Sequence, residues 1–423
     1  MSKRYTMATT VDQVPEHLVV DFDIHDQSNA GPVDQVPEKV SALRAKGPVV
    51  YSTAHGGHWI VTGYEEAHAV LRDAQTFSSF PNNLLQQGTD RFIPLEIDPP
   101  QHTAFRHALQ PLFNPKRMRE LEPKIRELTG KLLDGFAGRG RCEFISEFAH
   151  ELPTQMFLAL MGWPVEDAPM FTESVDTILV GKPGATDEES DAAKAEAGQR
   201  LYGYFGEVVA KRRAETLDPE QDVTSAVMNT PIEIDCEERL LTDPELFSMF
   251  FLLLIAGLHT VQGTLAWSMM YLAERPEQRQ RIIDDPESIP QAVEELLRIE
   301  AAISMGRRAT KDVDLGGVHL KEGDQMVVIL SGVNRDPSQF DAPTELQLDR
   351  SPNRHLSFGA GPHRCLGSHL ARVELAIALA EIHQRIPDYR LEADNPPISH
   401  ASQVRGVAVL PLEFTAEAQA PAA

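Results

Sequence analysis

The stretch Phe358-Gly359-Ala360-Gly361-Pro362-His363-Arg364-Cys365-Leu366-Gly367 decides the fold, because it places one cysteine among residues that bend the backbone. Glycine at 359 and 361 accepts backbone angles that a residue with a Cβ resists, so the loop can fold tightly beneath a flat molecule. Apolar residues recur at helical spacing from 366 to 376, which predicts a helix directly after Cys365. The positive end of that helix and the N–H groups of the loop favour a thiolate. We expect Gly367 to let the helix approach closely.

Cys365 is predicted to be a metal ligand. No second cysteine or histidine stands at the spacing of a zinc site, and a single thiolate suits the axial position of a haem iron better. The alternative is a buried free cysteine in a glycine-rich turn, which is the commoner situation for a lone cysteine. The rest of the chain has to decide between the two.

Length and composition narrow the class of protein. The chain has 423 residues, 42% of them hydrophobic, and no linker or repeat marks a domain boundary. A net charge of −24 disfavours nucleic acid and anionic membranes as partners. Three cysteines argue against a disulfide scaffold and fit a reducing compartment. Residues 1 to 20 lack a signal pattern, and the apolar run 249 to 258 is shorter than the ~20 residues of a membrane span. We therefore expect a cytoplasmic protein.

The longest predicted helix begins at a capping box of Thr242 and Glu245 and continues to residue 274. Its length of roughly 48 Å means that it must cross the middle of the domain. Ala256 or Gly257 shares a face with Thr260, so a flat ring could approach the backbone there with a hydroxyl beside it. The alternative is close packing of another helix against these small residues.

The cysteine loop has the pattern Phe-Gly-x-Gly-x-His-x-Cys-x-Gly and therefore resembles the haem-binding signature of the cytochrome P450 family. Similarity to the bacterial camphor hydroxylases, a soluble branch of that family, extends to Gly57-His58-Trp59-Ile60, Asp98-Pro99-Pro100 and Ile386-Pro387-Asp388-Tyr389. The resemblance implies a mainly α fold with small β-sheets, a helix-rich triangular prism. The resemblance further implies that this fold holds haem b, iron protoporphyrin IX, between the long central helix and the helix after Cys365.

We expect an extended lead-in over residues 1–36, a single haem-thiolate monooxygenase domain over 37–415 and a disordered tail over 416–423. The resemblance also implies a catalytic role for Thr260, whose hydroxyl helps to deliver protons for dioxygen activation. The residues expected to bind the cofactor are His102, Arg106, Ala256, Gly257, Arg307, Phe358, Gly359, His363, Cys365 and Gly367.

Two groups of these cofactor-binding residues, the pair His102 and Arg106 and the single Arg307, can be considered further. His102 and Arg106 lie four apart on one predicted helix face and are placed to hold an anion, although a solvated helix face would look the same. The resemblance assigns the haem carboxylates to Arg307, five residues before Asp312, rather than to its neighbour Arg308. Fixed cationic donors are what such carboxylates need.

His259 departs from the family pattern. The position before the threonine is normally Asp or Glu, and the imidazole here relays protons from a different resting charge. This predicts a second catalytic residue at 259 with a differently wired proton path. It also leaves open a peroxide-dependent or reductive haem-thiolate enzyme, or a non-catalytic haem or ligand-binding protein.

A structural network is expected behind the cysteine loop. Glu295 and Arg298 form the Glu-x-x-Arg pair of the family, which the resemblance joins to Arg350. Taken alone, such a pair is a common surface ion pair. Its order relative to Cys365 instead favours a buried network that is costly to break.

The resemblance implies a small hydrophobic substrate, with a terpenoid as one guess, and dioxygen as co-substrate. It also implies electrons from a ferredoxin and its reductase, since no flavin or nicotinamide motif occurs. Arg106, Lys116, Arg117, Arg119 and Arg364 are a candidate basic patch for an acidic ferredoxin, or an ordinary solvated face. Where camphor hydroxylases hold their substrate with a tyrosine, this chain has Thr89-Asp90-Arg91. The predicted pocket residues are Phe80, Asp90, Phe92, Leu252, Ile255, Ala256 and Ile303.

Overall fold

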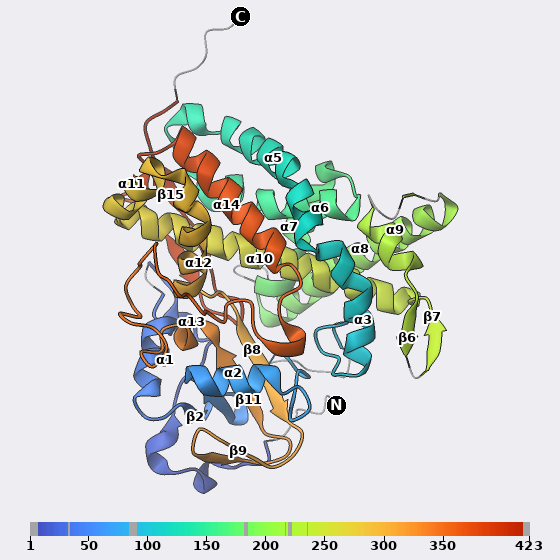
Figure 1. Ribbon diagram of the computed structural model, residues 1–423, viewed down its shortest axis with the longest axis vertical. Helices are drawn as coiled ribbons and strands as arrows, with labels where there is room; N and C mark the ends of the chain where they lie inside the picture. The colour runs from blue at the N-terminus through green and yellow to red at the C-terminus, as the bar shows by residue number, and fades with distance from the viewer. Residues whose placement is uncertain are drawn as a thin grey trace, which may run out of the picture.

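The structure, a computed structural model, describes residues 7–32, 34–83, 91–181, 185–215, 217–218, 222–234 and 236–417. A half rich in β-strands lies beside a larger helical half, and the longest helix runs through the latter (Figure 1). The predicted mainly α architecture with small sheets is therefore confirmed.

The largest sheet has six strands in the order β1, β2, β3, β11, β8 and β4. These strands are β1 (Val19–Val20), β2 (Val49–Ser52), β3 (His58–Val61), β11 (Gln325–Ile329), β8 (Ser304–Ala309) and β4 (Phe77–Ser78). β2 and β3 form a hairpin and pair antiparallel, with Tyr51 opposite Trp59. Short helices accompany the sheet, namely α1 (Val36–Arg44), α2 (Tyr64–Arg72) and α13 (Leu330–Val333).

The helical half buries two apolar clusters, one that includes Leu246 to Leu258 in the first part of the central helix and one that includes Val261 to Leu272 in its later part. Its helices are α3 (Gln101–Leu109), α4 (Pro115–Glu120), α5 (Glu122–Asp134), α6 (Glu151–Met161), α7 (Ala168–Val180), α8 (Asp187–Ala214), α9 (Val223–Asn229), α10 (Asp243–Glu274), α11 (Pro276–Asp284), α12 (Ile289–Ile299) and α14 (Ser368–Arg385). A short π-helix, Ile145–Ala149, leads into α6.

Four small sheets complete the fold. They comprise β5 (Arg141–Glu143) with β15 (Pro411–Glu413) and β12 (Arg390–Leu391), β6 (Ile232–Ile234) with β7 (Glu237–Arg239), β9 (Val313–Leu315) with β10 (Val318–Leu320), and β13 (Ile398–His400) with β14 (Gly406–Val409).

The central helix α10 follows the sequence prediction closely. Thr242 and Glu245 form the capping box, proline occupies the first turn, and the helix ends before Pro276. It packs against α6, α8, α12, α14 and β14. By length and composition α10 is also long and apolar enough to cross a membrane, but 56% of its most apolar window is buried inside the protein. Its apolar character is thus explained by the core of the protein.

Both ends of the described chain contact the rest of the protein. The part expected as an extended lead-in contributes β1 to the large sheet and buries Leu18 and Ile24 in its core. The predicted tail of 416–423 falls mostly outside the described residues and stays a prediction. Its second residue, Glu417, is ion-paired with Arg385, and its backbone donates to the carbonyl of Ala137.

Candidate functional site

The cysteine loop has the sharp backbone that the sequence predicts. Gly359 and Gly361 have φ of +68° and +69°, the left-handed region that glycine tolerates best. A Cβ on Gly361 would lie 2.5 Å from the carbonyl oxygen of Leu71 in α2, so only glycine fits. The loop closes on itself where the N–H of Cys365 donates to the carbonyl of Phe358, at 2.8 Å.

The role predicted for Gly367 stays a prediction. No protein atom among the described residues lies within 4 Å of where its Cβ would be. Gly367 precedes the first residue of α14, and its backbone N–H donates to the sulfur of Cys365. One of the loop N–H groups expected to face the sulfur is thereby identified.

Cys365 does not by itself favour the thiolate, contrary to the prediction. Burial raises the pKa of the thiol, and this outweighs the opposing effects of the Gly367 N–H and of the Arg106 guanidinium. The side chain nevertheless has accessible surface. A buried sulfur with an open side fits a metal ligand, since a coordinated metal ion supplies the positive charge that deprotonates a thiol.

One face of α10 is open in the middle of the protein. Ala256 is exposed although Leu254 and Leu258 on either side are buried, and the hydroxyl of Thr260 donates to the carbonyl of Ala256 at 2.9 Å. A small residue and a hydroxyl thus share this face, as predicted. Gly257 lies on another side, where a Cβ would make an ordinary contact of 3.6 Å with Phe157. Its role at the cofactor stays a prediction.

The predicted anion-binding residues gather into a cluster of donors. The rings of His102 and His363 lie 4.1 Å apart between centroids, and His102 Nδ1 and His363 Nε2 are buried without a partner among the described residues. Arg307 is 3% exposed and forms no ion pair within that part of the chain, donating to the carbonyl of Gly306 at 2.7 Å. Arg106 donates to the carbonyl of Arg364 at 2.8 Å.

The electrostatics of this cluster call for an anion. Burial lowers the pKa of Arg307 to about 10, with Asp98 opposing the shift. Burial, Arg307, His102 and Arg106 together lower the pKa of His363 to about 2. A buried cation without a counter-ion is costly. The two carboxylates of haem b would satisfy these donors, so the residues present fit that group.

Replacing Arg307 by Gln is expected to weaken haem retention, because the amide is neutral and one charge-assisted contact is lost. Such contacts contribute about 1.5–3 kcal/mol, or roughly a tenfold to hundredfold change in affinity. The rate of haem transfer to excess apomyoglobin measures the effect. Arg308→Gln is the matched control, since adjacent strand residues point to opposite faces of β8. Equal loss in the two variants would contradict the assignment of Arg307.

The expected network behind the loop is present and fully buried at its centre. Glu295 and Arg298 are both 0% exposed and joined by two hydrogen bonds of 2.7 and 2.8 Å. Arg350 donates to the same carboxylate at 3.0 Å. Two further donors to this carboxylate were not predicted, the backbone of Gln347 at 2.9 Å and the side chain of Asn353 at 3.1 Å. The common-surface-pair alternative is therefore wrong for this Glu-x-x-Arg motif.

The predicted substrate residues make separate contacts with different neighbours. Phe92 stacks on Phe251, with ring centroids 5.8 Å apart, and Arg91 lies over the ring of Phe80 at 4.4 Å. Ile303 forms an isolated bridge with Val404. The others on α10, Leu252, Ile255 and Ala256, are half-buried or exposed. Asp90 lies outside the described residues. Their shared role in binding a substrate stays a prediction.

Phe358 and the loop around it are fixed by neighbours on α14 and β8. The guanidinium of Arg372 lies 4.4 Å above the ring of Phe358. The position of a Cβ on Gly359 would be 3.1 Å from Cε of Met305. Leu366, directly after the cysteine, packs with Leu253 against the same apolar cluster. The cysteine loop and the open part of α10 thus adjoin a common core.

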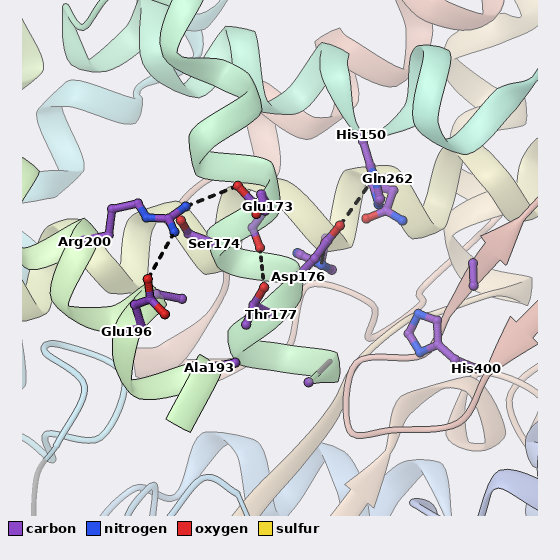
Figure 2. Close-up of a pocket in the computed structure, with 14 residues that line it drawn as sticks. His150, Glu173, Ser174, Asp176, Thr177, Ala193, Glu196, Arg200, Gln262 and His400 are labelled. Atoms are coloured by element: carbon purple, nitrogen blue, oxygen red, sulfur yellow. Dashed lines mark hydrogen bonds and ion pairs between the residues drawn. The ribbon is translucent and has the colours of Figure 1, made fainter. Parts of the chain in front are cut away.

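A cavity of about 540 Å³ lies between α7, α8, α10 and the β13–β14 hairpin (Figure 2). Of the predicted site residues, only His259 lines it. Its wall includes His150, Asp176 and His400, none of which the sequence marked, because they come from three separate parts of the chain without a shared motif. His259 Nε2 lies 3.0 Å from Oδ1 of Asp176.

Comparison with known proteins identifies the family. The cytochrome P450 family model matches residues 186–415. A probable cytochrome P450 127A1 of Sinorhizobium fredii is 33% identical over 416 residues, which cover 96% of this chain and 97% of the relative. Mycinamicin IV hydroxylase/epoxidase of Micromonospora griseorubida is 32% identical over 403 residues, covering 92% of this chain and 96% of that enzyme.

Solved structures agree. The crystal structure of CYP101J2 superposes with a TM-score of 0.83 at 31% identity, and that of CYP101C1 with a TM-score of 0.84 at 30% identity. In each case 96% of this chain and all of the other are covered. The predicted fold and cofactor are thus confirmed, and the cofactor is haem b. This chain belongs to the cytochrome P450 family of haem-thiolate monooxygenases.

Proposed function

We propose that this P450 inserts one atom of dioxygen into a C–H bond of a small hydrophobic substrate, with electrons from a ferredoxin. The observation that carries the proposal is the open face of α10, where Thr260 presents a hydroxyl beside exposed Ala256. Such a hydroxyl next to the reaction site serves to hold and pass a proton. Two relatives carry the names hydroxylase/epoxidase and N-oxygenase, which supports oxygen insertion as the reaction class.

Each residue of the site has one task in this proposal. Cys365 would hold the iron, and Arg307, His102 and His363 would hold the carboxylates of the haem. When bound, haem supplies dioxygen activation and one-electron transfer. Thr260 passes protons on the α10 face, with His259 as the neighbouring relay.

A ferredoxin is proposed as electron donor because basic residues gather near the cysteine loop of an otherwise acidic protein. Lys116 and Arg119 are exposed on α4, which packs against α14, and exposed Arg364 precedes the cysteine. Arg119 and Arg364 both act on His369 electrostatically, lowering its pKa after the larger effect of burial. Such a patch would steer an acidic partner to the haem edge.

The absence of any disulfide among the described cysteines is consistent with work in the cytoplasm.

The test reconstitutes the purified holoenzyme with a bacterial ferredoxin, its reductase, NADH and ¹⁸O₂ over a panel of terpenoids, fatty acids and aromatics. A spin-state titration first selects compounds that bind. The expected result is a product carrying one ¹⁸O atom. Product with hydrogen peroxide and none with ferredoxin and dioxygen would instead establish the peroxide-dependent alternative that His259 suggests. Tight binding without turnover in either assay would indicate a non-catalytic ligand-binding protein.

Replacing Thr260 by Ala is expected to separate electron use from product formation. NADH oxidation should continue while product per NADH falls at least tenfold, because positioned proton transfer contributes typically 10²–10⁴-fold. Thr264→Ala is the matched control, one turn along α10, where the hydroxyl only donates to the carbonyl of Thr260. Measured hydrogen peroxide release accounts for the lost electrons. Unchanged product per NADH in Thr260→Ala would contradict the proposed role.

A further inference from the structure

His259 belongs to a cluster of titratable groups from separate elements. Asp176 of α7 lies 3.0 Å from His259 through Oδ1 and 3.9 Å from Nδ1 of His150 through Oδ2. The rings of His150 and His259 are 6.2 Å apart between centroids. His400 of β13 lines the opposite wall of the cavity (Figure 2). The carboxylate of Asp176 therefore faces the imidazoles of His150 and His259 beside α10.

The contact with Asp176 sets the tautomer of His259. A carboxylate only accepts hydrogen bonds, so the nitrogen at 3.0 Å, Nε2, must carry the hydrogen. In the neutral ring, Nδ1 is then the proton acceptor. His259 is 9% exposed, and its Nδ1 is buried without a hydrogen-bond partner among the residues that the structure describes. The ring is thus held at Nε2, and Nδ1 is its unpartnered acceptor nitrogen.

The other charged groups around the cavity do not compete for this pairing. Arg200 of α8 is ion-paired with Glu173 at 3.2 Å and with Glu196 at 3.9 Å, on the far side from His150 (Figure 2). Burial lowers the pKa of His150, and lowers that of His400 to about 4, so both rings are neutral near pH 7. Asp176 is left as the carboxylate whose neighbours are imidazoles.

We propose that Asp176 is the positioning residue of the proton relay at His259. It holds the ring as the Nε2–H tautomer and stabilises the imidazolium that forms when Nδ1 accepts a proton derived from water. When this proton leaves towards Thr260, the ring returns to its neutral form, so the cycle leaves no proton behind. The carboxylate that the family places within the central helix is here supplied by α7 through an imidazole. This inference rests on the proposed oxygenase function.

The first test measures the ring itself. Nitrogen-15 NMR of histidine-labelled holoenzyme in its diamagnetic ferrous-carbonyl form, with His259→Gln to assign the signal, reports the tautomer. We expect the Nε2–H tautomer in the parent protein. Asp176→Asn should reduce the population of this tautomer, because an amide can donate as well as accept and no longer requires a hydrogen on Nε2.

Glu173→Gln is the matched control, because it removes a carboxylate from the same helix and the same cavity wall. Its tautomer at His259 should equal that of the parent. An Nδ1–H tautomer in the parent, or the same tautomer population in Asp176→Asn and the parent, would overturn the proposal. This measurement needs no turnover, so its outcome is separate from that of the oxygenase assay.

The second test follows product per NADH. In Asp176→Asn it should fall severalfold, whereas Asp176→Glu should restore it in part, since it restores a carboxylate that only accepts hydrogen bonds. A loss of product in Asp176→Asn with the tautomer of His259 unchanged would mean that Asp176 only supports the fold and would overturn its role at His259.

Discussion

Replacing Cys365 by Ser is expected to abolish the thiolate signature of the ferrous-carbonyl protein, a Soret band near ~450 nm. The sulfur of Cys365 accepts a hydrogen bond from the backbone N–H of Gly367, and the residue has accessible surface. Serine keeps the size of the side chain but not the soft thiolate that donates electron density to iron. Haem bound in the variant should therefore show the spectrum of an oxygen- or nitrogen-ligated protein, and product formation should cease.

The fold should survive this change, because the side chain of Cys365 has accessible surface and packs into no apolar cluster of the described residues. Far-UV circular dichroism and the urea midpoint check this. Cys236→Ser is the control, since Cys236 is exposed and distant in sequence from the loop. It should retain the ~450 nm band in full. The same band in Cys365→Ser would refute Cys365 as the ligand.

Replacing Glu295 by Gln is expected to lower the free energy of unfolding by about 3–5 kcal/mol. Glu295 is the shared acceptor for Arg298 and Arg350, and neither guanidinium has another carboxylate partner among the described residues. The neutral amide would leave two buried cations without a counter-ion. Because the same carboxylate also binds Asn353, close before the cysteine loop, haem retention should fall together with stability.

Urea denaturation followed by circular dichroism measures this loss, and the Soret absorbance follows the haem in the same samples. Glu127→Gln is the control, because it removes an exposed carboxylate between Lys124 and Lys131. Exposed pairs of this kind contribute little, so its midpoint should not change. If Glu295→Gln denatures at the same urea concentration as the control, the buried network does not hold the loop.

The sequence was sufficient wherever a feature has a local signal. The glycines of the cysteine loop, the capping box of α10 and the β2–β3 hairpin each depend on residues within a few positions of one another. The Glu295–Arg298 pair could also be found, because its two members lie one helical turn apart. Its buried state was expected only from the resemblance to the family, since burial depends on residues more than forty positions away.

The contacts around His259 had no such signal. Asp176 is 83 positions away, on a helix whose sequence gave no reason to single out any carboxylate. The thiol pKa at Cys365 was mispredicted for a related reason, because the cost of burial depends on the whole surrounding fold. The effect of a nearby helix dipole on a thiol pKa can be predicted from the sequence. The effect of desolvation on that pKa depends on how the whole fold packs around the thiol.

The first residues of the chain are tied to its last third. Thr9 donates to Asp324 through backbone and hydroxyl at 2.8 and 2.6 Å, Gln27 donates to the carbonyl of Ala401 at 2.7 Å, and buried Asp34 is ion-paired with Arg405. During synthesis the amino-terminal partners therefore emerge long before their counterparts. Domains usually fold from the amino end as they leave the ribosome. In this protein the strand-rich half can be completed only after nearly the whole polypeptide has been translated, whereas the apolar cluster whose buried residues lie between Phe105 and Leu258 can assemble earlier.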